Sequence, residues 1–255
     1  MDLQLKGKRA LISGASKGIG RACAHRLLEE GASVAFFARG QEAIDQTVAE
    51  LSKVGPIHGY SVDGADYDAV TAWADVAAEQ LGGIDIVINN TTASGQLEWG
   101  RQAYINNFDV DLMSCVALND AAYPWFRKAG GGAIVQIATI TAIEHHDMPI
   151  SPSYGAMKAA AINLTAQLAQ RWGPENIRAN CVSPGPIQFP GGVWDSVQVG
   201  YPKEYERDRT QHPLKRMGTD YEVADVVTFL ASPRAAWVNG ANVVVDGGFT
   251  KQVGY

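Results

Sequence analysis

Lys8-Arg9-Ala10-Leu11-Ile12-Ser13-Gly14-Ala15-Ser16-Lys17-Gly18-Ile19-Gly20 is a short apolar run that leads directly into a glycine-rich turn. Residues 8–13 predict a buried strand. Apolar residues then recur at helical spacing over 19–30, and Gly31 follows as a stop signal. Residues 34–38 are a second apolar run of strand length. A strand, a glycine turn, a helix and a strand are the first unit of a parallel α/β fold.

The same alternation continues to the end of the chain. Expected strands cover residues 57–62, 84–89, 133–139, 177–182 and 242–245, and expected helices cover 68–81, 105–128, 154–172 and 221–231. Near-continuous apolar strands separated by helices indicate a doubly wound parallel sheet with helices on both faces. We predict a single α/β domain over residues 1–255. Residues 184–213 are the least regular part, and such a long segment is typical of a functional lid or of disorder.

The composition argues against several classes of partner. A formal net charge of −6 offers no basic stripe for nucleic acid. The chain has no run of about 18 apolar residues, so we expect no membrane span, and from residues 1–6 we expect no secretory signal. Cys23, Cys115 and Cys181 form no metal-type or redox-type pair, so we interpret them as small buried apolar residues. They are typical of a reducing compartment, and we expect a cytoplasmic protein.

The glycine turn predicts a nucleotide site. Gly14, Gly18 and Gly20 allow a tight turn, close approach of a pyrophosphate and close packing of helix on strand. Ser16 and Ile19 lie in the same turn, and the helix that follows points backbone N–H groups at a bound phosphate. A ligand-free turn is the alternative, but the position between strand and helix favours binding.

The end of the second strand bears on the choice of dinucleotide. An acid there accepts from the ribose of NAD, whereas a basic residue binds the additional phosphate of NADP. The strand ends in Ala38-Arg39-Gly40 without an acid, and Lys17 adds a positive charge in the turn. Both cations can simply be solvated, but their joint placement predicts NADP(H).

Tyr154 and Lys158 are the candidate catalytic pair. In a helix over 154–172 they lie one turn apart on one face. A nearby ammonium lowers the pKa of a phenol, which is ordinarily about 10, and such a tyrosine can exchange a proton with a carbonyl or alcohol oxygen. A solvated helix edge is the competing interpretation of this spacing.

With these features in view, the sequence resembles the short-chain dehydrogenase/reductase family over nearly its whole length. The stretches that carry the resemblance are Ser13 to Gly20, Val62-Asp63, Asn89-Asn90, Tyr154 with Lys158, Asn180 to Gly185, and Val244 to Gly248. The resemblance implies a Rossmann-type sheet of about seven strands. It also implies hydride transfer between a nicotinamide cofactor and a small-molecule ketone or secondary alcohol, in a homotetramer.

The resemblance also assigns roles to single residues. It implies that the cofactor is held by Gly14, Ser16, Lys17, Gly18, Ile19, Gly20, Arg39, Asp63, Asn89, Tyr154, Lys158, Pro184, Gly185 and Ile187. It implies catalysis by Tyr154 and Lys158, with the lysine also holding the nicotinamide ribose. The family's substrate-holding serine and relay asparagine align with Thr139 and Asp111.

These two alignments mark departures from the family pattern. Thr139 keeps a hydroxyl donor, and Thr141 is its rival because two extra residues precede Tyr154. An ionised aspartate accepts but cannot donate, which leaves a relay through Asp111 open.

Four residues are candidates for the substrate side: Thr141, His145, Phe189 and Trp194. His145-His146-Asp147 either faces substrate or is a solvated loop, and the pattern predicts no metal site. Phe189 stands where the family often has a threonine. Together with Trp194 it forms either an aromatic wall over the substrate, loop packing or a subunit contact.

Two functions are compatible with this pattern. The first is an NADP(H)-dependent oxidoreductase, and the second is a non-catalytic nucleotide-binding scaffold or regulator on the same fold. Tyr154, Lys158 and the hydroxyl of Thr139 favour the first.

Overall fold

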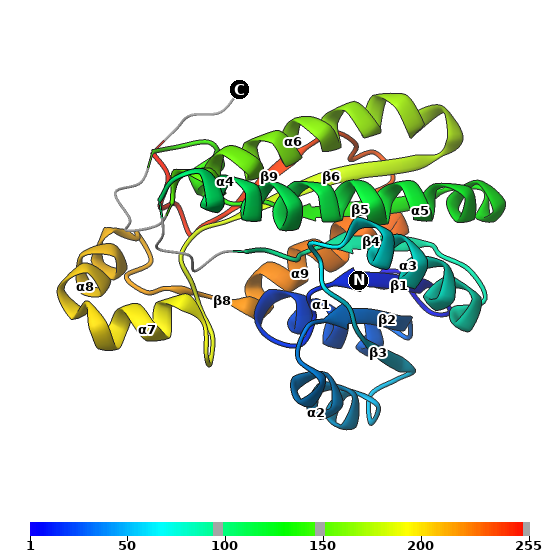
Figure 1. The fold of residues 1–255 in the computed structure, drawn as a ribbon, viewed down its shortest axis with the longest axis horizontal. Coiled ribbons are helices and arrows are strands. Elements are labelled where there is room, and N and C mark those ends of the chain that lie inside the picture. The colour runs from blue at the N-terminus through cyan, green and yellow to red at the C-terminus, as the bar shows by residue number, and fades with distance from the viewer. Residues whose placement is uncertain (94–98, 146–150, 252–255) are drawn as a thin grey trace.

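The structure is a computed structural model that describes residues 1–93, 99–145 and 151–251. These residues form a seven-stranded sheet in the order β3-β2-β1-β4-β5-β6-β9, and every neighbouring pair is parallel (Figure 1). The strands of this sheet are β1 (Arg9–Ser13), β2 (Ser33–Ala38), β3 (Ile57–Ser61), β4 (Ile86–Asn89), β5 (Gly132–Ile137), β6 (Ile177–Pro184) and β9 (Asn242–Val245). The predicted parallel α/β sheet is confirmed.

Helices cover both faces of the sheet. They are α1 (Gly18–Glu29), α2 (Gln41–Leu51), α3 (Tyr67–Leu81), α4 (Arg101–Asn107), α5 (Ser114–Ala129), α6 (Pro152–Trp172), α7 (Val193–Gly200), α8 (Pro202–Gln211) and α9 (Asp220–Ala231). Short segments add the π-helical η1 (Phe108–Met113) and the 3-10 turns η2 (Ile140–Ala142), η3 (Gly173–Glu175) and η4 (Pro233–Ala235). Among the helices of the described residues, none is long and apolar enough to cross a bilayer.

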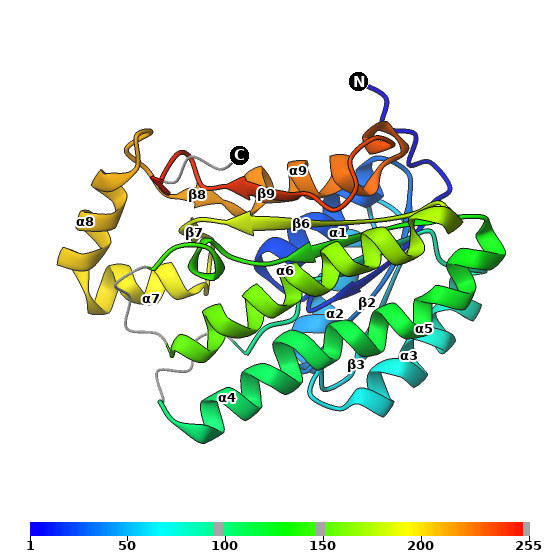
Figure 2. The ribbon, with the colours of Figure 1, turned by 90° about the horizontal axis from the view of Figure 1, so that it is seen from above.

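Alternate residues of the central strands feed two separate cores, because successive side chains of a strand point to opposite faces. Ile12 and Phe36 pack with α1 and α9, whereas Leu11 and Phe37 pack with α3, α5 and α6. Figure 2 shows α5 and α6 running side by side along the second face. The three cysteines are free and buried in the interior, as the sequence predicts.

The strand order reverses next to β1, which pairs with β2 on one side and β4 on the other. In open α/β sheets, ligands bind at the carboxyl ends of the strands at such a switch point. The fold therefore places the glycine turn after β1 and the residues after β4 at one edge.

Three segments differ from the sequence predictions. The amphipathic helix α2 was not predicted. The expected helix over 105–128 begins earlier, at Arg101, and is interrupted by the π-helical η1. Residues 184–213 are largely regular, with α7, α8 and the short strand β7 (Ile187–Gln188), which pairs with β8 (Gly218–Thr219). Figures 1 and 2 show α7 and α8 together beyond the end of β6.

Candidate active site

The glycine turn is packed too closely for side chains. A Cβ at Gly20 would lie 2.4 Å from the Gly14 carbonyl oxygen and 2.5 Å from Nδ2 of Asn90. Asn90 donates to that oxygen at 2.7 Å, and the Ser13 hydroxyl accepts from the backbone N–H groups of Asn90 and Thr91. The turn after β1 is thus fixed to the turn after β4.

This turn fits the anionic part of a dinucleotide. Lys17 precedes α1 in an extended conformation, and no side chain of the described residues caps the first turn of the helix. Its N–H groups therefore remain as donors for a phosphate. Thr91 Oγ1 is buried beside Gly14 without a hydrogen-bond partner. Such a buried orphan hydroxyl fits a polar ligand at this place.

The other proposed dinucleotide residues surround the turn at the surface. Arg39 is exposed directly after β2, and the Asp63 carboxylate accepts from the N–H of Ala65 at 3.0 Å. Lys17 extends toward the other side, where Nζ donates to the Gly191 carbonyl at 3.3 Å. The Ser16 carbonyl accepts from Thr47 on α2.

The remaining residues assigned to the cofactor lie at the carboxyl edge of the sheet. The Asn89 side chain donates to the side-chain oxygen of Asn119 on α5 at 2.9 Å. Asn119 therefore holds Asn89 and does not replace the relay asparagine that aligns with Asp111. Pro184 ends β6, and Gly185 donates to Val245 at 3.0 Å. Ile187 is buried in β7.

Lys158 projects from α6 into a fully buried polar cluster. Its Nζ forms an ion pair with Oδ1 of Asp111 at 3.1 Å, with side-chain exposures of 1% and 0%. It also donates to the backbone carbonyls of Ile137 at 3.1 Å and Thr91 at 3.4 Å. The lysine thereby joins α6, η1 and the ends of β4 and β5.

The charge on Lys158 does not make Tyr154 acidic. Burial raises the pKa of the Tyr154 phenol, Lys158 lowers it and Asp111 raises it again, so that the pKa lies above its ordinary value. Burial is the largest single effect on Lys158 and lowers its pKa, but Asp111, Tyr154 and Cys115 together outweigh burial, and that pKa is raised. The expected lowering of the tyrosine pKa is therefore wrong as a net effect, because burial and the second charge outweigh the ammonium.

Thr139, rather than Thr141, is the threonine whose side chain acts on the Tyr154 phenol. It lowers the pKa of that phenol, although burial keeps the net pKa raised. Thr139 caps the N-terminus of η2, where its hydroxyl oxygen accepts from the backbone N–H of Thr141 at 3.2 Å and from the Thr141 hydroxyl at 3.1 Å. Thr141 therefore donates to Thr139 in this arrangement. The Thr141 carbonyl oxygen lies so close to Gly155 that a Cβ there would be 2.7 Å from it.

Asp111 is held by a residue that sequence reasoning missed. Asn107, the last residue of α4, donates from Nδ2 to Oδ2 of Asp111 at 2.7 Å, and the N–H of Ala93 donates to the same oxygen at 3.1 Å. Ser153 donates to Oδ1 of Asn107 at 2.7 Å, and Ser151 lies 2.7 Å further on. The spacing of four between Asn107 and Asp111 was a signal in the sequence, because such residues share a helix face.

The candidate substrate residues do not gather into one wall. The Phe189 ring packs against the glycine turn, so that a Cβ at Gly18 would lie 2.5 Å from it. Trp194 is buried with Tyr205 and Met217 between α7 and α8. His145 is exposed, whereas His146 and Asp147 lie outside the described residues.

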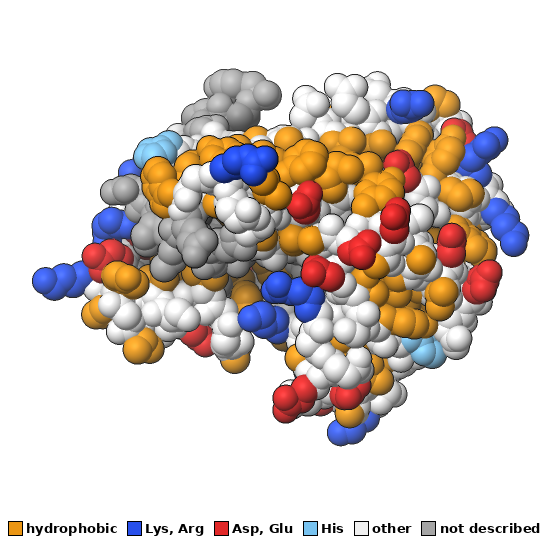
Figure 3. Space-filling view, viewed as in Figure 1, with side chains coloured by type: hydrophobic (Ala, Val, Ile, Leu, Met, Phe, Trp, Pro, Cys, Tyr) orange, Lys and Arg blue, Asp and Glu red, His pale blue; other side chains and the backbone are white. Residues whose placement is uncertain are grey.

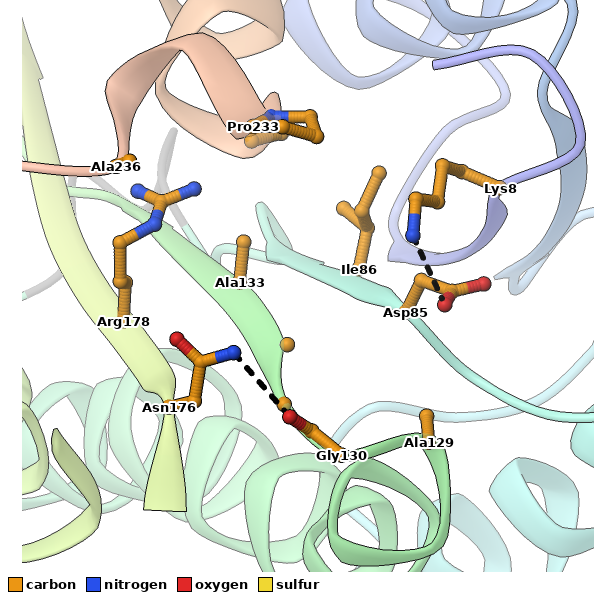
Figure 4. Close-up of a pocket in the computed structure, with 13 residues that line it drawn as sticks. Lys8, Asp85, Ile86, Ala129, Gly130, Ala133, Asn176, Arg178, Pro233 and Ala236 are labelled. Atoms are coloured by element: carbon orange, nitrogen blue, oxygen red, sulfur yellow. Dashed lines mark hydrogen bonds and ion pairs between the residues drawn. The ribbon is translucent and has the colours of Figure 1, made fainter. Parts of the chain in front are cut away.

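A separate pocket of about 220 Å³ lies at the amino ends of the strands, away from these residues (Figure 4). Lys8 pairs with Asp85 at 3.6 Å, and the half-buried Arg178 donates to the carbonyls of Leu230 and Ser232 at 2.9 Å. Since these cations already have partners in the protein, this pocket is structural. The described residues contain no group of three or more His, Cys, Asp or Glu side chains arranged to hold a metal ion.

Comparison with known proteins gives the family. The model of a family described as enoyl-(acyl carrier protein) reductase, within the short-chain dehydrogenases, matches residues 14–250. The chain belongs to the short-chain dehydrogenase/reductase family. It is 36% identical over 249 residues to isoepoxydon dehydrogenase from Penicillium expansum, covering 96% of this chain and 95% of that protein.

Solved structures of this family superimpose over nearly the whole chain. L-sorbose reductase from Gluconobacter frateurii, complexed with NADPH and L-sorbose, has a TM-score of 0.91 at 29% identity, covering 99% of this chain and 100% of that one. A 7α-hydroxysteroid dehydrogenase complexed with NADH and 7-oxo glycochenodeoxycholic acid has a TM-score of 0.89 at 31% identity, covering 99% and 98%. The chain is thus an oxidoreductase that interconverts an alcohol and a ketone with a nicotinamide cofactor.

Proposed function

We propose that the protein is an NADP(H)-dependent reductase of ketones, with Tyr154 as the proton donor. The observation that carries this proposal is the cluster of Tyr154, Thr139 and Lys158 beside the turn that fits a dinucleotide. The lysine reaches the carbonyl of Thr91, and Thr91 is also bound to the glycine turn through Ser13. The catalytic cluster and the nucleotide turn are therefore built as one unit.

Each side chain has a separate task in this mechanism. The bound nicotinamide supplies or removes a hydride. Tyr154 donates the phenolic proton to the carbonyl oxygen, and takes it back when an alcohol is oxidised. The Thr139 hydroxyl holds the same oxygen, and the Lys158 ammonium fixes the ribose hydroxyls and the orientation of the phenol.

The preference for NADP(H) rests on the end of β2. Arg39 is exposed there without a neighbouring acid in the strand, and a guanidinium is suited to two parallel hydrogen bonds with a phosphate. Lys17 contacts Gly191 in the present conformation and would have to turn to assist. We therefore assign the preference to Arg39 first.

We infer that the substrate is a mainly apolar, cyclic ketone or secondary alcohol bound beneath residues 184–213. The surface of α7 and its C-terminal end supports this, since Val193 is 40% exposed and Tyr201 is 52% exposed. A panel of cyclic ketones and short polar ketones tests the inference. Faster turnover of the short polar ketones would contradict it.

We also infer a homotetramer and a cytoplasmic location. Hydrophobic side chains gather over α5 and α6 in the space-filling view of Figure 3. Tyr104 on α4 and Phe108 at the start of η1 are each 43% exposed. Light scattering measures the assembly directly, and a stable monomer at micromolar concentration would argue against it. The free buried cysteines are compatible with a reducing compartment.

The decisive experiment compares the wild type with Tyr154→Phe. Oxidation of NADPH is followed optically with the ketone panel, and NADPH binding is followed by fluorescence. We expect turnover to fall by about 100- to 10,000-fold, because a general acid is lost, while cofactor affinity stays nearly unchanged. Full activity of the variant would refute the mechanism. Cofactor binding by a wild type that reduces no ketone would favour the scaffold.

A further inference from the structure

The site carries a negative charge that a tyrosine–lysine pair does not require. Asp111 lies 3.1 Å from Lys158 Nζ, and both side chains are almost completely inaccessible to solvent. Two opposite charges so close in a buried place largely cancel one another at a third group nearby. Tyr154 is that third group, because both charges act on its phenol.

The contacts of Asp111 match an ionised carboxylate. Oδ2 accepts from Asn107 and from the N–H of Ala93, while Oδ1 faces the ammonium of Lys158. Asn107 cannot turn its oxygen toward Asp111 without loss, because that oxygen accepts from Ser153. All three neighbours thus present a donor or a positive charge to this carboxylate, and the ion pair with Lys158 is one of these contacts.

The other titratable groups around the pair are neutral. Cys115 on α5 raises the pKa of Lys158, and Lys158 lowers the pKa of Cys181 on β6. Burial outweighs this effect and raises the pKa of the two thiols to about 11 and about 12. The end of β5 and the turn after β4 contribute the backbone carbonyls of Ile137 and Thr91, and the Thr139 hydroxyl follows β5. Within the described part of the chain, Asp111 and Lys158 are the charges that act on Tyr154.

We propose that Asp111 is a positioning residue that neutralises Lys158, so that Tyr154 keeps its proton at neutral pH and the site favours donation to a ketone over acceptance from an alcohol. The inference rests on the proposed function. In the reduction, the carbonyl carbon gains the hydride that a bound reduced nicotinamide would supply, the cofactor being oxidised, as the C=O π bond opens. The phenolic O–H bond breaks, and its proton goes to the carbonyl oxygen. The phenolate of Tyr154 then regains a proton from solvent.

Ketone reduction and alcohol oxidation should depend differently on pH. Reduction needs the phenol, so its rate should be flat through the neutral range. Oxidation needs the phenolate, whose fraction rises tenfold for each pH unit below the midpoint of its titration. Oxidation should therefore rise tenfold per unit through neutrality and level off only in alkaline solution.

The test removes the charge of Asp111 while keeping its shape. Asp111→Asn retains an oxygen that can accept from Asn107 and Ala93. Asp109→Asn is the matched control, because Asp109 lies in the same π-helical segment, is half-buried and stands outside the ion pair. For each protein, ultraviolet absorbance is titrated against pH, and the same titration with Tyr154→Phe added is subtracted. Alcohol oxidation is measured over the same pH range with saturating cofactor.

We expect the wild-type midpoint of Tyr154 to lie above the ordinary value of about 10. Asp111→Asn should lower it by at least about one unit and shift the oxidation profile in parallel, whereas Asp109→Asn should change neither. Equal midpoints in wild type and Asp111→Asn overturn the proposal, and so does an equal shift in the control. If Asp111→Asn does not fold, a wild-type midpoint near neutrality overturns it, and a midpoint above about 10 supports it.

The absorbance titration needs no substrate. It therefore tests the role of Asp111 separately from the proposed function. If the midpoint is raised and Asp111→Asn lowers it, but the protein reduces no ketone, only the proposed function is refuted.

Discussion

Gly20→Ala tests whether the close packing of the glycine turn is required for stability and for cofactor binding. The new Cβ would lie 2.4 Å from the Gly14 carbonyl oxygen, 0.6 Å inside the 3.0 Å limit that real Cβ contacts respect, and 2.5 Å from the Asn90 nitrogen that donates to this oxygen. Neither atom can give way easily, because one is backbone and the other joins the turn to β4.

The magnitude follows from three opposing effects. Overpacking costs about 1–3 kcal/mol, and losing the hydrogen bond costs about 0.5–1.5 kcal/mol. Replacing a helical glycine by alanine returns about 1 kcal/mol. We expect a net loss of about 0.5–3.5 kcal/mol in the free energy of unfolding, or about 2–4 °C in Tm for each kcal/mol in a domain of this size. NADPH affinity should fall at least about tenfold, since the phosphate-facing N–H groups shift with the turn.

The assays are thermal unfolding by circular dichroism and fluorescence titration with NADPH. Gly200→Ala is the control, because Gly200 is also helical and a Cβ there meets nothing within 4 Å. This control should be neutral or slightly stabilising and should bind NADPH as the wild type does. If Gly20→Ala has the same Tm and the same NADPH affinity as Gly200→Ala, the close packing at Gly20 is not required for stability or for cofactor binding.

Three further predictions concern single side chains. Thr139→Ala should lower turnover by about 100-fold through loss of a donor to the substrate oxygen, whereas Thr141→Ala should lose little; steady-state kinetics showing the reverse would exchange their roles. Arg39→Asp should abolish or invert the preference for NADPH over NADH, a change of about one to two powers of ten in the ratio of dissociation constants, and equal wild-type affinities would contradict it. Glu222 has its pKa lowered to about 2, first by Arg216 and then by the backbone N–H of Thr219 at the helix cap. Its contribution to stability is therefore complete above about pH 4.5 and is lost as pH falls toward 2. The Glu222 side chain is 44% exposed, so Glu222→Gln should lower the free energy of unfolding by only about 1 kcal/mol at pH 7. In denaturation near pH 3, the difference in this free energy between Glu222→Gln and the wild type should be smaller.

The sequence alone determined the sheet. Apolar runs of strand length and the helical spacing between them are local patterns, and a parallel sheet covered on both faces is the arrangement that buries such strands. The glycine spacing from Gly14 to Gly20 was equally local, since a turn that excludes side chains can be recognised from a few consecutive residues. The three cysteines have no metal-type or redox-type spacing, which predicted that they are small buried residues, and they are free and buried.

The tertiary structure alone decided the environment of the catalytic pair. The sequence placed Tyr154 and Lys158 on one helix face, but it did not reveal that Asp111 closes on Lys158 or that Asn107 and Ser153 hold Asp111 in place. A charge acts through space and burial depends on every neighbour, so residues more than forty positions apart in the chain decide the acidity of one phenol. For the same reason Trp194, a candidate for the substrate wall, belongs to the packing of α7 on α8.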